Sequence, residues 1–322
     1  MKRRELILGL AGALVGMRAF AQVPGRTYRI GSLFAAPRDA PHHIALFDQL
    51  RRSGFIEGKN LIVDWAGYGL RVEQFDEHAA EIVQAGFDVI EAGGDAAVRA
   101  AQKATAEIPI VALADDMVGQ GFVRSLAKPG GNTTGVTILA AQLDGKRQSI
   151  LIEALPGIRR IAALADRTMI NGLHLGELRD AARSQGVGLS THSVARPEDI
   201  PAALEEARAS GAEALNVLAS ALFYNNRPMI FDGVAALRLP AMYQWPEMAH
   251  QGGLIGYGPS ILQLYRDVQS RQLVRLLGGA KPADLPVEQP TKFDLVINLK
   301  TVKALGLTMP PILLAQADEV IE

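Results

Sequence analysis

The alternation of strand and helix patterns is the feature that most constrains how this chain folds. Short apolar runs of strand length recur about every 20–30 residues, with amphipathic helical patterns between them. In the first series the expected strands are residues 28–34, 61–65, 87–92 and 108–114. Parallel neighbours need long crossover connections, which are usually helices. The rhythm therefore predicts parallel sheets covered by helices on both faces.

A turn-rich stretch at 128–135 separates this series from a second one. The second series ends in a long amphipathic helix expected at 262–277. Its expected strands are 160–165, 189–194, 214–219, 240–243 and 253–257. A length of 322 residues favours two domains and leaves one or three open. The predicted fold class is α/β, with two doubly wound parallel-sheet lobes, a hinge and a central cleft.

The first 21 residues have the pattern of a secretory signal peptide. Lys2, Arg3 and Arg4 precede an apolar run at 6–17, and Ala19-Phe20-Ala21 ends the segment with small residues at the positions that signal peptidase reads. Cleavage is expected after Ala21, which places the mature chain in the periplasm. The adjacent arginines also fit the twin-arginine export route, and both routes stay open.

Composition and motifs narrow the classes of function. The formal net charge is −1, which argues against a nucleic-acid partner. The chain has no cysteine, which excludes disulfides, thiolate metal sites, a cysteine nucleophile and a lipidated cysteine anchor. No nucleophile elbow, phosphate-binding loop or metalloprotease motif occurs. We therefore expect no catalytic residue, no metal and no cofactor.

Two pairs of adjacent polar residues are expected to have no metal-binding or catalytic role. His42 and His43 follow Pro41 at the start of a helix and are expected to be solvated, while the other four histidines are read as surface or structural residues. Asp115 and Asp116 are adjacent on an extended segment. Their side chains therefore point to opposite faces and are not expected to form a catalytic dyad.

Candidate ligand-binding residues lie where the expected strands end, because open α/β sheets bind ligands beyond the carboxyl ends of their strands. Gly94 allows close backbone approach, and the N–H of Ala96 suits an anion. Asp95 is expected to cap that helix. Aromatic rings near strand ends can stack on a ligand or pack beneath loops. The complete set is Phe34, Trp65, Gly94, Asp95, Ala96, Asp116, Ser220, Phe223, Tyr243, Trp245 and Tyr257.

Several segments resemble the ABC-transporter substrate-binding family related to bacterial tryptophan and tyrosine uptake proteins. They span nearly the whole mature chain in order. They are the GFIEGKNL run at 54–61, LAKPGGNTTG at 126–135, GGLIGYGP at 252–259, and GGAKPADLPVEQPTKFDLVINLK at 278–300.

The resemblance implies the type I periplasmic-binding-protein fold and a receptor that closes two lobes around a small molecule. It implies delivery of that ligand to an ABC permease in the inner membrane, by a protein expected to be a monomer. Lobe 1 is expected to hold residues 27–138 plus about 258–282. Lobe 2 is expected to hold residues 139–257 plus about 283–322.

Departures from the family pattern bear on the ligand. Ser220 stands where the family commonly has an aspartate, and Pro246 lies near the position of a usual arginine. Asp95 or Asp116 could replace the missing acid. We expect an aromatic or apolar carboxylate, or an amino-acid-like compound.

A receptor that signals to a membrane kinase and an enzyme on the same fold are the alternatives. Sugar-responsive repressors share the fold but carry a DNA-binding helix-turn-helix at the front, where this chain has its signal-like segment.

Overall fold

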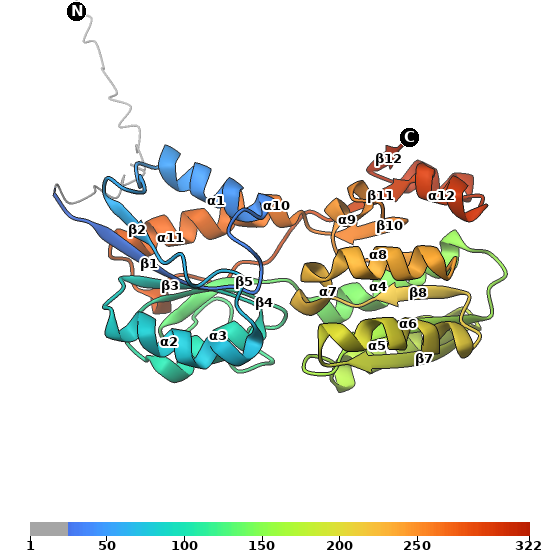
Figure 1. Ribbon diagram of the computed structural model, residues 1–322, viewed down its shortest axis with the longest axis horizontal. Helices are drawn as coiled ribbons and strands as arrows, with labels where there is room; N and C mark the ends of the chain where they lie inside the picture. The colour runs from blue at the N-terminus through green and yellow to red at the C-terminus, as the bar shows by residue number, and fades with distance from the viewer. Residues whose placement is uncertain (1–24) are drawn as a thin grey trace, which may run out of the picture.

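The computed structural model describes residues 25–322, which form two α/β lobes side by side (Figure 1). The first sheet has the strand order β2-β1-β3-β4-β5, and all of its strand pairs are parallel. The second sheet has the order β12-β11-β10-β9-β8-β6-β7. Both sheets have helices on both faces. The predicted class, two doubly wound lobes, is confirmed.

Lobe 1 is built around a sheet whose side chains alternate between two cores. Ile30 of β1 packs with α1 on one face, and Leu33 packs with α2 and α3 on the other. The elements of this part are β1 (Tyr28–Leu33), α1 (Pro41–Arg52), β2 (Leu61–Val63), η1 (Val72–Gln74), α2 (Phe75–Gln84), β3 (Val89–Gly93), α3 (Asp95–Ala104), β4 (Ile110–Ala114) and β5 (Thr133–Thr137).

Lobe 2 also has two cores. Helices α4, α12 and α13 pack on one face of the sheet, and α6 and α8 pack on the other. The elements are α4 (Ala140–Ala154), β6 (Arg160–Asp166), α5 (Gly172–Ser184), β7 (Gly188–Val194), η2 (Pro197–Asp199), α6 (Ile200–Ala209), β8 (Ala214–Val217), α7 (Ala221–Asn225), α8 (Arg227–Ala236), β9 (Ala241–Tyr243), α9 (Pro246–His250), β10 (Ile255–Gly258), β11 (Asp294–Asn298), α12 (Leu299–Leu305), α13 (Pro311–Gln316) and β12 (Glu319–Ile321).

The chain passes between the sheets three times: after β5, after β10 and before β11. After β10 it runs back over lobe 1 as α10 (Ile261–Gln263), the π-helical turn η3 (Leu264–Gln269) and α11 (Ser270–Leu277). The turn η4 (Pro282–Asp284) follows. On lobe 1 the Thr134 hydroxyl donates to Gln272 Oε1 at 3.0 Å. The expected continuous helix at 262–277 is therefore interrupted by a π-helical turn.

Two further expectations are wrong. The stretch at 128–135 is not only a turn, because β5 (Thr133–Thr137) begins within it and completes the first sheet. Gly135 of this strand has φ +140°, and a Cβ there would meet the Ala112 carbonyl oxygen at 1.9 Å, so the close approach requires glycine. The second sheet is not wholly parallel, because β11 runs antiparallel to β10.

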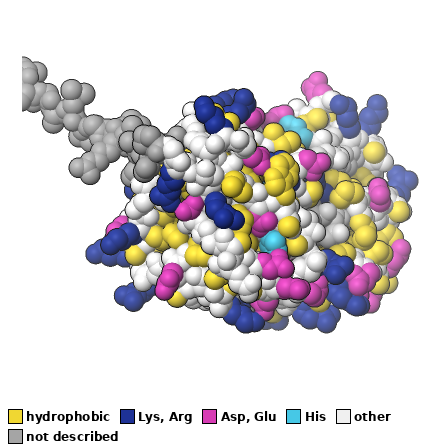
Figure 2. All heavy atoms as spheres, turned by 60° about the vertical axis from the view of Figure 1, so that its left-hand side comes forward, with side chains coloured by type: hydrophobic (Ala, Val, Ile, Leu, Met, Phe, Trp, Pro, Cys, Tyr) yellow, Lys and Arg dark blue, Asp and Glu magenta, His cyan; other side chains and the backbone are white. Residues whose placement is uncertain are grey.

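Charged side chains are mixed in sign on the face shown in Figure 2, with basic and acidic groups interspersed. Across residues 25–322, no helix combines the length and apolarity needed to cross a membrane. The expected signal peptide at 1–21 lies outside the described residues.

A buried ion pair ties together the ends of three lobe 2 strands. Asp144 Oδ1 accepts from Arg147 Nη1 at 2.7 Å and from the Ala219 N–H, just past β8, at 3.1 Å. Arg147 also donates to the Gln244 carbonyl, just past β9, at 2.9 Å and to the Tyr257 carbonyl of β10 at 2.7 Å. Both charged side chains are fully buried. The pair therefore fixes the edge of the sheet that faces lobe 1.

Replacing Asp144 with asparagine should destabilise the fold by about 3–5 kcal/mol, because Arg147 would remain buried without its counter-charge. Chemical denaturation monitored by circular dichroism measures the change. Asp180→Asn is the matched control, since Asp180 forms an exposed pair with Arg183 at 3.8 Å and the same spacing. The control should stay within about 0.5 kcal/mol of the wild type. Equal stabilities of the two variants would contradict this account.

Candidate functional site

A cavity lies between the lobes, at the carboxyl ends of strands from both sheets. Its interior measures about 70 Å³. Lobe 1 and the α10–η3 segment contribute Phe34, Ala35, Ala36, His42, Gly93, Gly94, Leu113, Asp115, Ile138, Ile261 and Tyr265. Lobe 2 contributes Met169, Ser220, Ala221, Tyr224, Asn225, Gln244 and Trp245. Ligand pockets commonly measure ~300–1,000 Å³, so the two lobes lie nearly shut on each other in this conformation.

Aromatic rings form a continuous wall across the junction of the lobes. Phe34 and Tyr265 lie 6.2 Å apart between ring centroids, and Tyr265 lies 4.6 Å from His42. His42 then contacts Tyr224 of lobe 2 at 5.7 Å, and Tyr224 contacts Trp245 at 6.4 Å. The wall thus joins lobe 1 to lobe 2. Such rings suit a planar or apolar ligand body.

His42 and His43 are not solvated, contrary to the sequence expectation. They are 2% and 0% exposed, because Tyr265 from the returning segment packs against both rings. Burial lowers the pKa of His42 to about 2, with the charges of His43 and Arg227 adding to the effect. Burial likewise lowers the pKa of His43 to about 4. Both rings are therefore neutral near pH 7, and His42 presents a neutral imidazole to the cavity.

Two acidic residues of lobe 1 are hydrogen-bonded neighbours, and one of them, Asp115, lines the cavity. Asp95 is not the helix cap: Gly94 occupies that position with φ +91°, and Asp95 begins α3. Asp95 Oδ1 instead accepts from the Asp115 N–H at 3.1 Å. Burial, followed by the charge of Asp95, raises the pKa of Asp115 well above its usual range. Burial also raises the pKa of Asp95.

The lobe 2 side of the cavity is held by a dense hydrogen-bond network around Ser220. The Ser220 hydroxyl donates to Asp166 Oδ2 at 2.7 Å and accepts from the Leu222 N–H at 3.0 Å, which caps α7. Gln244 exchanges two hydrogen bonds with the Ser220 backbone, each at 2.9 Å. Ser220 therefore serves to position the loop, and its hydroxyl is already engaged.

The structure brings some of the predicted site residues together and leaves others apart. Phe34, Gly94, Ser220 and Trp245 line the cavity between the lobes. Asp116 lines an adjoining small cavity that shares Asp115 and Met169 with it. Asp95 and Ala96 begin α3 beside Gly94.

The remaining four predicted residues lie elsewhere. Trp65 is 58% exposed beneath the Arg38 guanidinium, on the surface of lobe 1. Phe223 is fully buried in a hydrophobic core. Tyr257 packs against Phe293, and Tyr243 lies at a second cavity described below.

The lining residues that the predicted set lacks include the aromatic and polar residues His42, Asp115, Tyr224, Gln244 and Tyr265. Tyr224 and Asp115 each neighbour a residue that was selected, so an estimate of which way each side chain points could have found them. His42 and Tyr265 meet across more than 200 residues of chain, and no local pattern reports that contact.

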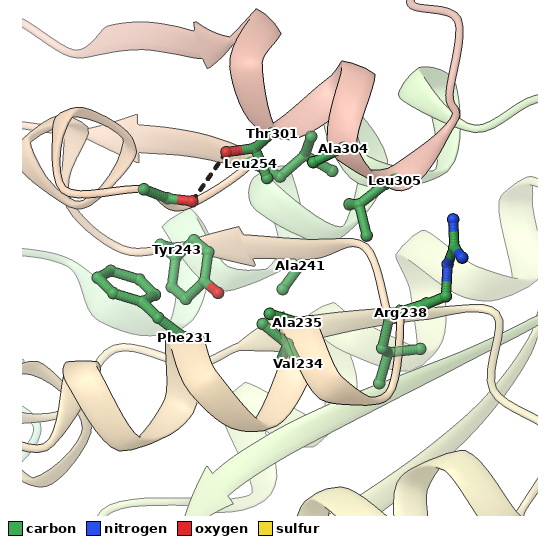
Figure 3. A pocket seen from close by; sticks show the side chains of 12 residues that line it. Phe231, Val234, Ala235, Arg238, Ala241, Tyr243, Leu254, Thr301, Ala304 and Leu305 are labelled. Carbon is green, nitrogen blue, oxygen red and sulfur yellow. Dashed lines mark hydrogen bonds between the residues drawn. The ribbon is translucent and has the colours of Figure 1, made fainter.

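A second cavity of about 320 Å³ lies on lobe 2 between α8, β9 and α12 (Figure 3). The rings of Phe231 and Tyr243 meet edge to face at 5.1 Å, and the Thr301 hydroxyl donates to the Gly252 carbonyl at 2.9 Å. All of its lining residues belong to lobe 2. Movement between the lobes therefore cannot close it over a ligand.

In residues 25–322, no group of three or more histidine or acidic side chains is placed to hold a metal ion. The candidate site is the cavity between the lobes, which has aromatic rings from both sides and the Asp115 carboxyl group from lobe 1.

Comparisons with known proteins give a family match and a fold match. The family model described as ABC transporter substrate binding protein matches residues 43–321. A tyrosine-binding protein of Clostridioides difficile is 23% identical over 261 residues, which cover 80% of this chain and 74% of that protein.

Solved structures at 24% identity show the same fold. One is a conserved domain protein from Vibrio cholerae with a TM-score of 0.82, and another is an ABC domain in complex with L-Trp from Streptococcus pneumonia with a TM-score of 0.80. Each comparison covers 92% of this chain and 100% of the other.

A buried glutamate behind the aromatic wall makes the fold sensitive to pH. Glu91 of β3 is fully buried, accepts from Gln269 Nε2 at 3.2 Å, and burial raises its pKa to about 8. The folded state keeps this proton up to about pH 8, whereas the unfolded chain loses it above pH ~4.5. Stability therefore falls as the pH rises through that interval.

Glu91→Gln should remove this dependence, because a neutral amide keeps the hydrogen bond and has no charge to bury. At pH 8 the variant should exceed the wild type by a few kcal/mol, and at pH 5 the two should differ little. Urea unfolding at both pH values measures the free energy of unfolding of each protein. Subtracting the wild-type value from the variant value at each pH removes the contributions of other groups such as His42 and His43. Stability curves that run parallel between pH 5 and 8 would show that Glu91 is not the source.

Proposed function

We propose, from the premise that this chain belongs to the ABC transporter substrate-binding protein family, that it captures a small molecule between its two lobes. Members of this family bind solutes outside the cytoplasm and deliver them to an ABC permease. The observation that supports capture at this place is the cavity lined by both lobes. The family is one of binding proteins and not of enzymes.

The capture mechanism follows from contacts that exist only when the lobes are together. A ligand that touches Phe34 and Tyr265 on one side and Tyr224 and Trp245 on the other stabilises the closed form over the open one. In the closed form Gly94 of lobe 1 faces Ala221 of lobe 2, where a Cβ on Gly94 would come within 3.5 Å of the Ala221 Cβ. The lobes must therefore separate to admit a ligand and close again to retain it.

The ligand class we propose is an aromatic or apolar amino-acid-like compound. The aromatic wall supplies a surface for the ligand body, and the start of α3 at Ala96 supplies backbone N–H groups for a carboxylate. The names of two similar proteins support this class, since one is a tyrosine-binding protein and another was solved with L-Trp.

The finer assignments are part of the same proposal. Ligand contacts are assigned to Phe34, Gly94, Ala96, Ser220 and Trp245. Lobe 1 is assigned residues 27–138 plus about 258–282, and lobe 2 residues 139–257 plus about 283–322. We further propose export to the periplasm with cleavage after Ala21, and action as a monomer that does not bind nucleic acid.

Thermal unfolding of the purified protein across a metabolite library tests the proposed function. A ligand present at 100 times its Kd adds about 2.7 kcal/mol of stability and should raise the Tm by roughly 5–10 °C. Amino acids and their aromatic derivatives should be among the hits. A library that yields no stabilising compound would contradict the proposal.

The two tryptophans form a matched pair of variants. Trp245→Leu should weaken binding of the ligand at least tenfold, because Trp245 lines the cavity and is 4% exposed. Trp65→Leu should change the affinity less than threefold, because that ring lies on the outer surface of lobe 1. Isothermal titration calorimetry measures both, and circular dichroism confirms that each variant is folded. Equal losses of ligand affinity in the two variants would contradict the placement of the ligand in the cavity.

A further inference from the structure

One carboxyl group in the cleft lacks the hydrogen bonds that buried acids usually have. Asp115 lines both the cavity between the lobes and the adjoining small cavity, and it is 9% exposed. Among residues 25–322, no hydrogen-bond partner reaches its buried Oδ2, nor the buried Oδ2 of the neighbouring Asp95. Buried polar atoms are paired in the great majority of cases, so an unpaired carboxyl oxygen at a cavity requires an explanation.

Most other acids near the cleft have hydrogen-bond partners. Asp166 receives hydrogen bonds from Thr168 and Ser220, and Asp144 receives them from Arg147 and Ala219. Glu91 Oε2 and Glu247 Oε2 are also buried without a partner among residues 25–322, but neither residue lines the cavity. The carboxyl group that lines the cavity with an unpaired oxygen is therefore that of Asp115, and His42 Nδ1 is the other buried unpaired side-chain atom there.

No lysine or arginine of residues 25–322 lines the cavity or its small neighbour. The nearby arginines are engaged elsewhere: Arg147 holds Asp144 and two carbonyls, Arg99 binds Gln120 over the Phe122 ring, and Arg227 binds Gln251 and the Tyr224 carbonyl. A charged group on the ligand that complements the cavity is therefore positive.

We propose that the cleft recognises a protonated amine on an aromatic or apolar body, with Asp115 as its acceptor and Asp95 beside it. An ammonium group carries three N–H donors, one of which reaches the unpaired Oδ2 of Asp115, and its charge complements the carboxylate. The aromatic wall of Phe34, His42, Tyr265, Tyr224 and Trp245 holds the body of the same molecule. This inference rests on the proposed function and deepens it, because it makes the amine and not the carboxylate the group on which binding depends.

Matched probes that differ in one group test the inference by calorimetry. The indole set is tryptamine, tryptophol and indole-3-propionate, the phenol set is tyramine, tyrosol and 3-(4-hydroxyphenyl)propionate, and the aliphatic set is isoamylamine, isoamyl alcohol and 4-methylpentanoate. In at least one set the amine should bind at least tenfold more tightly than the alcohol and the carboxylate. An alcohol or carboxylate that binds as tightly as its amine would overturn the inference.

Asp115→Asn identifies the acceptor. It should weaken binding of the best amine at least tenfold and leave binding of the matching alcohol within threefold. The Tm of the unliganded variant should be equal to or above that of the wild type, because a buried acid without a partner has been removed. Asp180→Asn changes the net charge equally in an exposed pair on α5 and should alter amine affinity less than threefold. Equal losses from both variants would overturn the assignment to Asp115.

The failure of this inference differs from the failure of the proposed function. If none of the amines binds while other members of the metabolite library stabilise the protein, the amine inference is wrong and the solute-binding function stands. If no compound of any class binds, the proposed function itself is wrong.

Discussion

The buried pair of Asp144 and Arg147 is the interaction on which the site depends. It joins α4 to the backbone just past β8, just past β9 and at the end of β10, which is the edge of lobe 2 that faces the cleft. Ser220 and Trp245 follow directly after the backbone atoms held in this way. Replacing both charges by apolar groups could leave the fold stable, but loss of one partner leaves the other buried and unpaired. The pair therefore holds Ser220 and Trp245 in place within lobe 2.

The cleft combines neutral rings with a carboxyl oxygen of Asp115 that has no hydrogen-bond partner among residues 25–322. His42 stays neutral because it is buried beside Arg227 and His43. It therefore packs against Tyr224 without adding its own positive charge to that of Arg227. On the other side of the cavity, Asp115 has an unpaired carboxyl oxygen, and neither arginine nor lysine is among the lining residues. This asymmetry favours a ligand that is apolar at one end and cationic at the other.

Much of the fold could be predicted from the sequence, because strand and helix periodicities are local. The strand β5 was missed since Thr-Thr-Gly-Val-Thr follows a turn and contains a glycine, yet Gly135 is needed where the strand approaches Ala112. The site was predicted less well because it depends on which way side chains point. Phe223 and Tyr224 are adjacent on α7, but only Tyr224 lines the cavity. Trp65 follows β2, the edge strand of its sheet, and lies on the outer surface, whereas Trp245 follows a central strand.

The central claim is that one ligand touches both lobes in the cavity beside the aromatic wall. A crystal structure of the protein with a ligand found by the thermal screen tests it most directly. The account predicts electron density for that ligand between Phe34 and Trp245, with contacts to residues on both sides of the cleft. Density confined to the lobe 2 cavity of Figure 3, beside Phe231 and Tyr243, would contradict it.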